Sequence, residues 1–120
     1  MRQKVKFVII IHMIKIAFFE IEDWEIDYVK NRLSNAEFFF SKEKLNKDNL
    51  PEILRQNSGL TDFDAISVFV GSEIKKEVID NFPNLKLITT RSTGFDHVDL
   101  QTAKEKNIKT GYVPGYGDNT

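Results

Sequence analysis

The sequence predicts a single α/β domain, a three-layer sandwich built around a parallel five-stranded sheet. Three observations support this fold class. The chain has 120 residues, enough for one domain with a buried core. Five short apolar runs, nearly continuous and rich in β-branched and aromatic residues, are typical of strands covered on both faces. Helical patterns separate these runs, and a strict alternation of strand and helix favours right-handed crossovers between parallel strands.

The apolar runs define the expected strands. They occupy residues 14–19, 37–40, 65–70, 85–90 and 108–113. The second run contains three consecutive phenylalanines, which we interpret as a core strand and not as an aromatic binding platform.

The first two helices are expected after the first and second strands. Acidic residues at 22–25 put negative charge where a helix N-terminus favours it, and apolar residues follow at helical spacing. Trp24 on this helix is expected to pack against the sheet. Asp48 or Asn49 can cap the second helix.

Two further helices complete the alternation. Ser72 is expected to cap the third helix, which Pro83 would end. Asp99 is expected to cap a short fourth helix that runs through Lys106, and Asn107 is a plausible left-handed residue after its end.

Composition excludes several classes of protein. Lys and Arg number 17 against 18 Asp and Glu, for a net charge of −1, so the basic stripe of a nucleic-acid binder is not expected. The absence of cysteine excludes a disulfide framework and thiolate metal sites, and only two histidines make a zinc site unexpected. We therefore predict no metal, no nucleic acid and a cytoplasmic location.

The N-terminal segment resembles a signal peptide only superficially. An apolar run at residues 7–11 follows basic residues, but His12 and Lys15 interrupt it and no small-residue cleavage site follows. The run is too short to span a membrane. We interpret residues 1–12 as an extension ahead of the first strand, with Met13 as a possible true start.

Ligands of open α/β sheets gather at the carboxyl ends of the strands. After the fourth strand come Ser92, Thr93 and Gly94. Gly94 allows a positive φ, so that consecutive N–H groups could converge on an anion, and the two hydroxyls could add donors. A small carboxylate would suit this loop. The alternative is a plain strand-to-helix turn capped by its own hydroxyls.

Other chemical signals are weak. His97 has no nucleophile or fixed carboxylate partner that the sequence establishes, and is expected to be a polar surface residue. No GxGxxG motif is present, so the chain carries no dinucleotide fingerprint. The residues alone are typical of a flavodoxin-like domain with one possible anion-binding loop.

The C-terminal residues resemble a linker that leads into a further helix. Residues 113–120 contain one proline and two glycines and then a possible helix cap among Asp118, Asn119 and Thr120, so a further element is expected to follow. The sequence is therefore expected to be a fragment.

Four segments carry a family resemblance: residues 13–20, 66–70, 84–99, which contain RSTGFDHVD, and 107–120, which contain VPGYGDNT. They resemble the D-isomer-specific 2-hydroxyacid dehydrogenases, and most of all the D-lactate dehydrogenase branch. The resemblance covers residues 13–120. It implies that residues 13–112 form the N-terminal part of the substrate-binding (catalytic) domain and that residues 113–120 are a hinge toward a missing NAD-binding domain.

The resemblance also implies site residues. It places the substrate carboxylate on the backbone N–H groups of Ser92, Thr93 and Gly94. The remaining implied contacts are a pocket wall from Phe69 and Val70, an aromatic cleft residue at Tyr116, and proximity to the nicotinamide at Asp118, Asn119 and Thr120. Phe69 stands where some relatives carry tyrosine, so a hydroxyl contact at this position is not expected.

The catalytic Arg, His and Glu of the family lie beyond residue 120, and so does its glycine-rich NAD loop. The resemblance thus implies an NAD-dependent oxidoreductase that interconverts a 2-oxo acid and a D-2-hydroxy acid. These small acids are the expected partners, and the full-length parent is expected to be a homodimer. The chain alone is expected to be inactive. The alternative is a stand-alone flavodoxin-like module that binds small carboxylates or a partner. The particular 2-hydroxy acid and the choice between NAD and NADP stay open.

Overall fold

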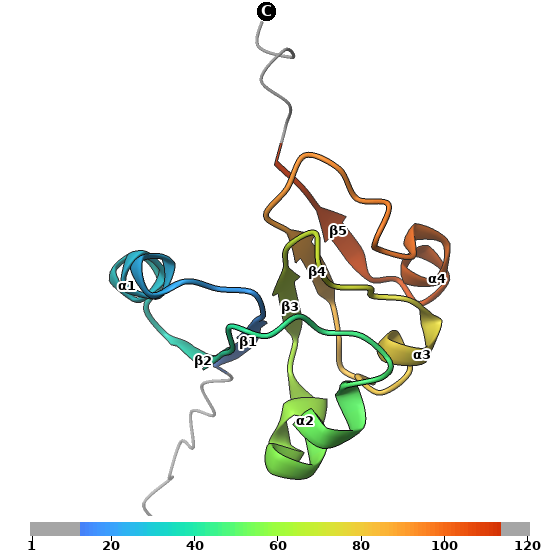
Figure 1. Cartoon of the computed structure of the whole chain (residues 1–120), viewed down its shortest axis with the longest axis horizontal. Helices are drawn as coiled ribbons and strands as arrows, with labels where there is room; N and C mark the ends of the chain where they lie inside the picture. Colours follow the sequence, from blue (N-terminus) through green and yellow to red (C-terminus); the bar gives the residue numbers. More distant parts are fainter. Residues whose placement is uncertain (1–12, 114–120) are drawn as a thin grey trace, which may run out of the picture.

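A computed structural model describes residues 13–113 of the chain. One parallel sheet in the order β2-β1-β3-β4-β5 forms its centre (Figure 1). Its strands are β1 (Ile14–Phe18), β2 (Ala36–Phe40), β3 (Ala65–Val68), β4 (Leu87–Thr90) and β5 (Lys109–Gly111). This arrangement confirms the predicted fold class.

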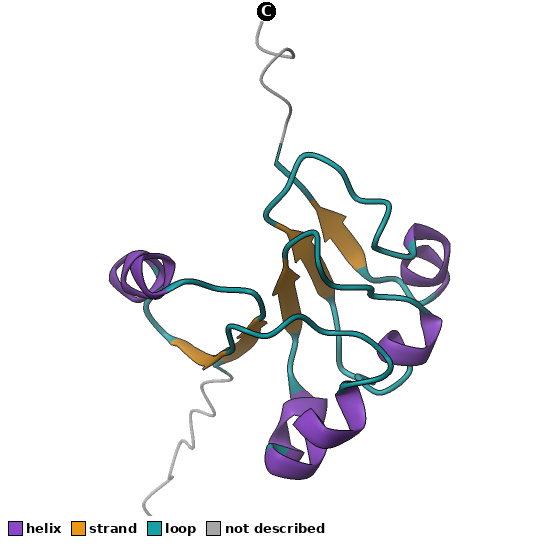
Figure 2. Cartoon of the chain, in the orientation of Figure 1, coloured by secondary structure: helices purple, strands orange, loops and turns teal. Residues whose placement is uncertain are grey.

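Helices separate the strands along the chain, as Figure 2 shows. They are α1 (Asp23–Arg32), α2 (Leu50–Gln56), α3 (Lys76–Ile79) and α4 (Leu100–Glu105), with the short 3₁₀ helix η1 (Ser58–Asp62) after α2. The β1–α1–β2 connection moves along the sheet in the direction opposite to the later connections. Right-handed crossovers therefore put α1 on one side of the sheet and α2, α3 and α4 on the other (Figure 1).

The main core lies between the sheet and the three-helix layer. It is filled by buried side chains of the central strands and of α2, α3 and α4, among them Ala17, Ile66, Ile88, Ile53, Val78 and Ala103. β3 at the centre of the sheet is buried at every residue, whereas the edge strands β2 and β5 have no buried residue. The expectation of strands covered on both faces therefore holds at the centre of the sheet and fails at its edges.

The layer on the α1 side is thinner than the sequence predicts. No residue of α1 is buried, and Trp24 is 70% exposed, so the expectation that Trp24 packs against the sheet is wrong. The phenylalanines of β1 and β2 contact one another instead, with ring centroids 5.3 Å apart for Phe38 and Phe40 and 5.6 Å apart for Phe18 and Phe40. A single helix with a narrow apolar face does not cover this side.

Two predicted caps differ from the structure. α3 begins at Lys76, and the predicted cap Ser72 is fully buried in the loop before it. Asn49 stands at the N-cap position of α2, but its side chain accepts from the N–H of Asn46 (2.9 Å) and donates to the carbonyl of Lys44 (2.6 Å). Asn49 thus bonds within its own loop, whereas Ser72 donates to the carboxylate of Glu20 and accepts from the N–H of Leu45, both far away in the sequence.

The fourth helix follows its prediction closely. Asp99 Oδ1 accepts from the N–H of Thr102 at 3.0 Å, and Asn107 has a φ of 60°. In the part of the chain that the structure describes, no helix is long and apolar enough to cross a membrane. The proposed extension at residues 1–12 lies outside the described residues.

Candidate functional site

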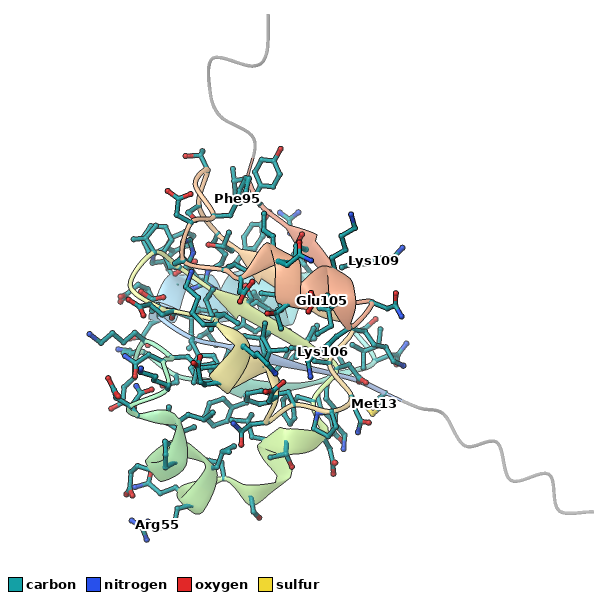
Figure 3. All side chains as sticks on the ribbon, turned by 90° about the vertical axis from the view of Figure 1, so that its right-hand side faces the viewer. Met13, Arg55, Phe95, Glu105, Lys106 and Lys109 are labelled. Carbon is teal, nitrogen blue, oxygen red and sulfur yellow. The ribbon has the colours of Figure 1, made fainter. Side chains whose placement is uncertain are left out.

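The carboxyl ends of β1, β3 and β4 lie side by side, because these strands are neighbours in the sheet. Three loops follow them, containing Glu20, Phe69 and the segment Ser92, Thr93 and Gly94, which we call the 92–94 loop. Figure 3 shows Phe95, just after this loop, at the opposite end of the molecule from Arg55 of α2. This edge is where an open parallel sheet places its ligands.

Glu20 joins the first two of these loops. Its backbone has a φ of 55°, a left-handed conformation that is uncommon outside glycine. Its carboxylate accepts hydrogen bonds from the N–H of Phe69 (2.8 Å), the N–H of Gly71 (2.8 Å) and Oγ of Ser72 (2.6 Å). Glu20 therefore fixes the start of the loop after β3, a role that the sequence did not reveal.

Arg91 holds the ends of β1 and β3 together. One terminal nitrogen donates to the carbonyls of Phe19 (2.6 Å) and Glu20 (2.8 Å), and the other to Oγ of Ser67 (2.9 Å). Its Nε lies 3.3 Å from a carboxylate oxygen of Glu25. Burial lowers the pKa of the Arg91 guanidinium, and Glu25 opposes that effect. These partners occupy the guanidinium, so Arg91 has a structural role here.

The 92–94 loop differs from the predicted nest. The structure has no glycine with a positive φ among residues 13–113, so Gly94 is not left-handed. Oγ of Ser92 donates its hydrogen to the Gly94 carbonyl at 2.7 Å, so this hydroxyl is not free to bind an anion. This contact is the one expected of the alternative interpretation, a strand-to-helix turn capped by its own hydroxyls.

The backbone of the 92–94 loop nevertheless stays accessible. Thr93 and Gly94 are exposed. Within residues 13–113, their N–H groups donate no hydrogen bond to another protein atom. No described residue therefore competes with an anion for these two adjacent N–H groups at the edge of the sheet.

His97 is more constrained than a surface residue. Its Nε2 lies 2.7 Å from Oγ1 of Thr90, whose hydroxyl lies 2.6 Å from Oγ of Ser92. Burial is the main cause that lowers the pKa of His97; the Lys75 charge adds to this, while Glu20 and Asp96 oppose it. The expectation of a plain surface histidine is therefore wrong, because the loop folds back over β4.

The predicted wall residues lie on the loop after β3. Phe69 is 41% exposed and Val70 56% exposed. Phe69 also borders a cavity of about 380 Å³, lined in addition by Glu20, Glu22, Trp24, Glu25 and Arg91. This cavity lies on the α1 side and does not include the 92–94 loop, so the structure does not join Phe69 and that loop in one cavity.

Tyr116, Asp118, Asn119 and Thr120 lie outside the described residues. In the described part of the chain, no group of three or more His, Cys, Asp or Glu side chains could hold a metal ion.

Several known proteins are similar to this chain in sequence or in fold. A D-lactate dehydrogenase of Staphylococcus aureus is 30% identical over 112 residues, covering 90% of this chain and 32% of that protein. A glycerate dehydrogenase of Hyphomicrobium methylovorum is 46% identical over 52 residues, covering 42% of this chain and 16% of that protein. The crystal structure of D-lactate dehydrogenase from Aquifex aeolicus, complexed with NAD and lactic acid, matches with a TM-score of 0.70 and 30% identity, covering 84% of this chain and 28% of that one.

The chain spans about a third or less of the length of these relatives. Residues 16–120 match the family described as D-isomer specific 2-hydroxyacid dehydrogenase, catalytic domain. Since this match extends over most of the sequence, the chain belongs to the D-isomer specific 2-hydroxyacid dehydrogenase family.

Proposed function

We propose that this chain is part of an NAD-dependent D-2-hydroxyacid dehydrogenase and anchors the carboxylate of a small 2-oxo or D-2-hydroxy acid of the lactate and pyruvate type. The full enzyme would be a cytoplasmic homodimer that interconverts the two acids by hydride transfer. The observation that carries the proposal is the pair of exposed N–H groups on Thr93 and Gly94, which lack an acceptor within the described residues.

The chemistry of the loop suits a carboxylate. An ionised carboxylate accepts N–H hydrogen bonds that are shorter and stronger than those to a neutral acceptor. Two adjacent N–H groups can each meet an oxygen lone pair and thereby fix the orientation of the acid. Thr93 is an exposed residue, whereas the hydroxyl of Ser92 is already used within the loop.

The described residues do not fit the dinucleotide. A pyrophosphate site needs a small, donor-rich turn after the first strand. Here that turn contains Glu20, Glu22 and Asp23, and the Glu20 carboxylate already occupies the neighbouring N–H groups of Phe69 and Gly71. We therefore assign no NAD contact to residues 13–113 and no step of hydride transfer to them. Proximity of Asp118, Asn119 and Thr120 to the nicotinamide stays a prediction.

The test is a titration of the ¹⁵N-labelled chain with pyruvate. We expect the amide signals of Thr93 and Gly94 to shift in a saturable manner. A Cβ added at Gly94 would meet no atom within 4 Å, and the backbone there is not left-handed, so Gly94→Ala should fold normally. Its methyl group would crowd the approach to the loop, and we expect about tenfold weaker binding.

Gly59→Ala is the matched control. A Cβ at Gly59 also meets nothing within 4 Å, and this residue lies in η1, away from the carboxyl edge of the sheet. Its affinity for pyruvate should equal that of the unmodified chain. Unchanged amide signals at saturating pyruvate would exclude carboxylate anchoring by this loop.

The dehydrogenase assignment has a separate test. The chain alone should oxidise no NADH in the presence of 2-oxo acids, because the family resemblance places the catalytic Arg, His and Glu beyond residue 120. The intact mass of the native gene product then distinguishes the two functions. A mass near three times 13.9 kDa supports the dehydrogenase, whereas pyruvate binding by a native product of 13.9 kDa supports a stand-alone binding module.

A further inference from the structure

A chain of hydrogen bonds runs beneath the 92–94 loop. Nε2 of His97 lies 2.7 Å from Oγ1 of Thr90, and that oxygen lies 2.6 Å from Oγ of Ser92. Oγ of Ser92 in turn lies 2.7 Å from the carbonyl oxygen of Gly94. Thr90 and Ser92 are both buried, with 3% and 9% of their surface exposed. This series of hydrogen bonds thus starts at the imidazole of His97 and ends at the backbone of the 92–94 loop.

The Gly94 carbonyl at the end of this series fixes the donor and acceptor of every hydrogen bond in it. A carbonyl oxygen only accepts, so Ser92 must donate its single hydroxyl hydrogen to Gly94. Ser92 therefore accepts from Thr90, which uses the single hydrogen of that hydroxyl. Thr90 in turn must accept from His97, and this requires a hydrogen on Nε2.

The backbone of His97 is fixed from the other side. Its carbonyl accepts from the N–H of Ile74 at 2.8 Å, and Nζ of Lys75 donates to the carbonyl of Asp96 at 2.8 Å. Ile74 also pairs with Val98 in a β-bridge. The backbone at His97 is therefore held by the segment before α3, while its imidazole contacts Thr90 of β4.

We infer that His97 is the positioning residue of the carboxylate-binding loop and acts as the Nε2–H tautomer through Thr90 and Ser92. The chain of hydrogen bonds turns the Gly94 carbonyl toward the protein, which keeps this electronegative oxygen away from an anion at the neighbouring N–H groups. This inference deepens the proposed function and rests on it for the identity of the ligand. His97 touches no reacting atom in this role.

The tautomer is measured first, by long-range ¹H–¹⁵N correlation on the imidazole of the full chain above the pKa of His97. We expect the hydrogen on Nε2. A hydrogen on Nδ1 would overturn the inference, because Thr90 would then have to donate to His97 and could not donate to Ser92.

Paired substitutions test the consequence for the loop. His97→Gln keeps a distal N–H donor and Thr90→Ser keeps the hydroxyl, so both should preserve the amide signals of Thr93 and Gly94. His97→Leu and Thr90→Val each remove one hydrogen-bonding side chain from the series, and both should shift the amide signals of Thr93 and Gly94. We expect pyruvate binding to weaken by about fivefold, the effect of one lost hydrogen bond. Thr61→Val, in η1, is the matched control for loss of a hydroxyl.

The two proposals fail in different ways. If pyruvate shifts no signal, while His97 is the Nε2–H tautomer and Thr90→Val displaces the Thr93 and Gly94 amides, the positioning role stands and the carboxylate function is wrong. If pyruvate binds equally well to Thr90→Val and to the unmodified chain, the positioning role is wrong. The tautomer measurement needs no variant, so a hydrogen on Nδ1 overturns the positioning role even if His97→Leu fails to fold.

Discussion

At the scale of single residues, the carboxyl edge of the sheet depends on charged side chains whose partners are mostly backbone groups. Glu20 accepts from the N–H groups of Phe69 and Gly71, and Arg91 donates to the carbonyls of Phe19 and Glu20. Backbone groups at the ends of strands have no ladder partner, and buried ones need another partner. Each charged residue thus satisfies groups on loops that are far apart in the sequence.

Gly71 permits the approach of Glu20, and its substitution should therefore destabilise the protein. A Cβ at Gly71 would lie 2.5 Å from Oε1 of Glu20. The carboxylate cannot easily move away, because its two oxygens together accept three hydrogen bonds. We expect Gly71→Ala to lower the free energy of unfolding by about 1 to 3 kcal/mol. Urea denaturation measures this change, with Gly59→Ala as the control that leaves stability unchanged. Equal midpoints for the two variants would contradict the proposed role of Glu20.

His97 should make stability depend on pH. Burial lowers its pKa in the folded protein below the ordinary value of 6.5, so the unfolded chain binds the proton more readily. The stability that neutral His97 contributes is therefore present above pH 6.5 and is lost as the pH falls through the lower folded pKa.

The measurement compares the free energy of unfolding at about pH 8 and about pH 5.5 for the chain and for His97→Gln. The carboxylates titrate in both proteins, so their effect cancels in the difference. The unmodified chain should lose more stability on acidification than His97→Gln, and parallel losses would exclude the predicted contribution.

At the scale of the elements, the helices divide into those that the core stabilises and one that depends on its own sequence. α2, α3 and α4 each contribute buried side chains, whereas α1 contributes none. α1 instead carries a capping box between Glu22 and Glu25, with Lys30 and Arg32 in its last turn. These local features favour a helix without tertiary packing.

Asp99 is the clearest local stabiliser of α4. Hydrogen bonds from the backbone and the hydroxyl of Thr102 lower the pKa of the Asp99 carboxyl. We expect Asp99→Ala to cost about 1 kcal/mol of stability, as loss of an N-cap usually does. Thermal unfolding measures the effect, and Asp99→Asn should recover most of it because the amide oxygen still accepts from the helix. A fully stable Asp99→Ala would show that packing of α4 alone suffices.

At the scale of the whole molecule, the α1 side of the sheet is exposed and apolar. Exposed members of this face and of α1 include Ile14 (54%), Trp24 (70%) and Tyr28 (53%). The register places Ile14 and Leu87 on the same sheet face as Phe18, opposite the main core. Exposed apolar surface of this kind favours association.

We therefore expect the isolated chain to self-associate through this face as its concentration rises. Trp24 is the single tryptophan, so its fluorescence emission should move to shorter wavelength when copies bury it. Sedimentation should show that Trp24→Lys is less associated, whereas Tyr112→Lys, at an aromatic residue that is 57% exposed elsewhere, is not. A monomer with a sharp, reversible unfolding transition at all concentrations would contradict this expectation.

The sequence by itself determined the features that depend on neighbours along the chain. Five apolar runs predicted five parallel strands, and the cap at Asp99 and the left-handed Asn107 were found where local chemistry requires them. The RSTGFDHVD and VPGYGDNT segments indicated the family that residues 16–120 match. Helix caps, left-handed residues and apolar periodicity involve groups only a few residues apart, so the sequence exposes them directly.

Only the tertiary structure decided the contacts that build the carboxyl edge. Glu20 and Gly71 are 51 residues apart, and Arg91 and Phe19 are 72 apart, and they meet because β1, β3 and β4 are adjacent in the sheet. Ser72 does not cap α3 because its hydroxyl donates to the carboxylate of Glu20. Ser92 and His97 both form hydrogen bonds with Thr90, because the loop after β4 folds back over that strand. A polar side chain takes the partner that strand order brings within reach, and no local pattern contains that information.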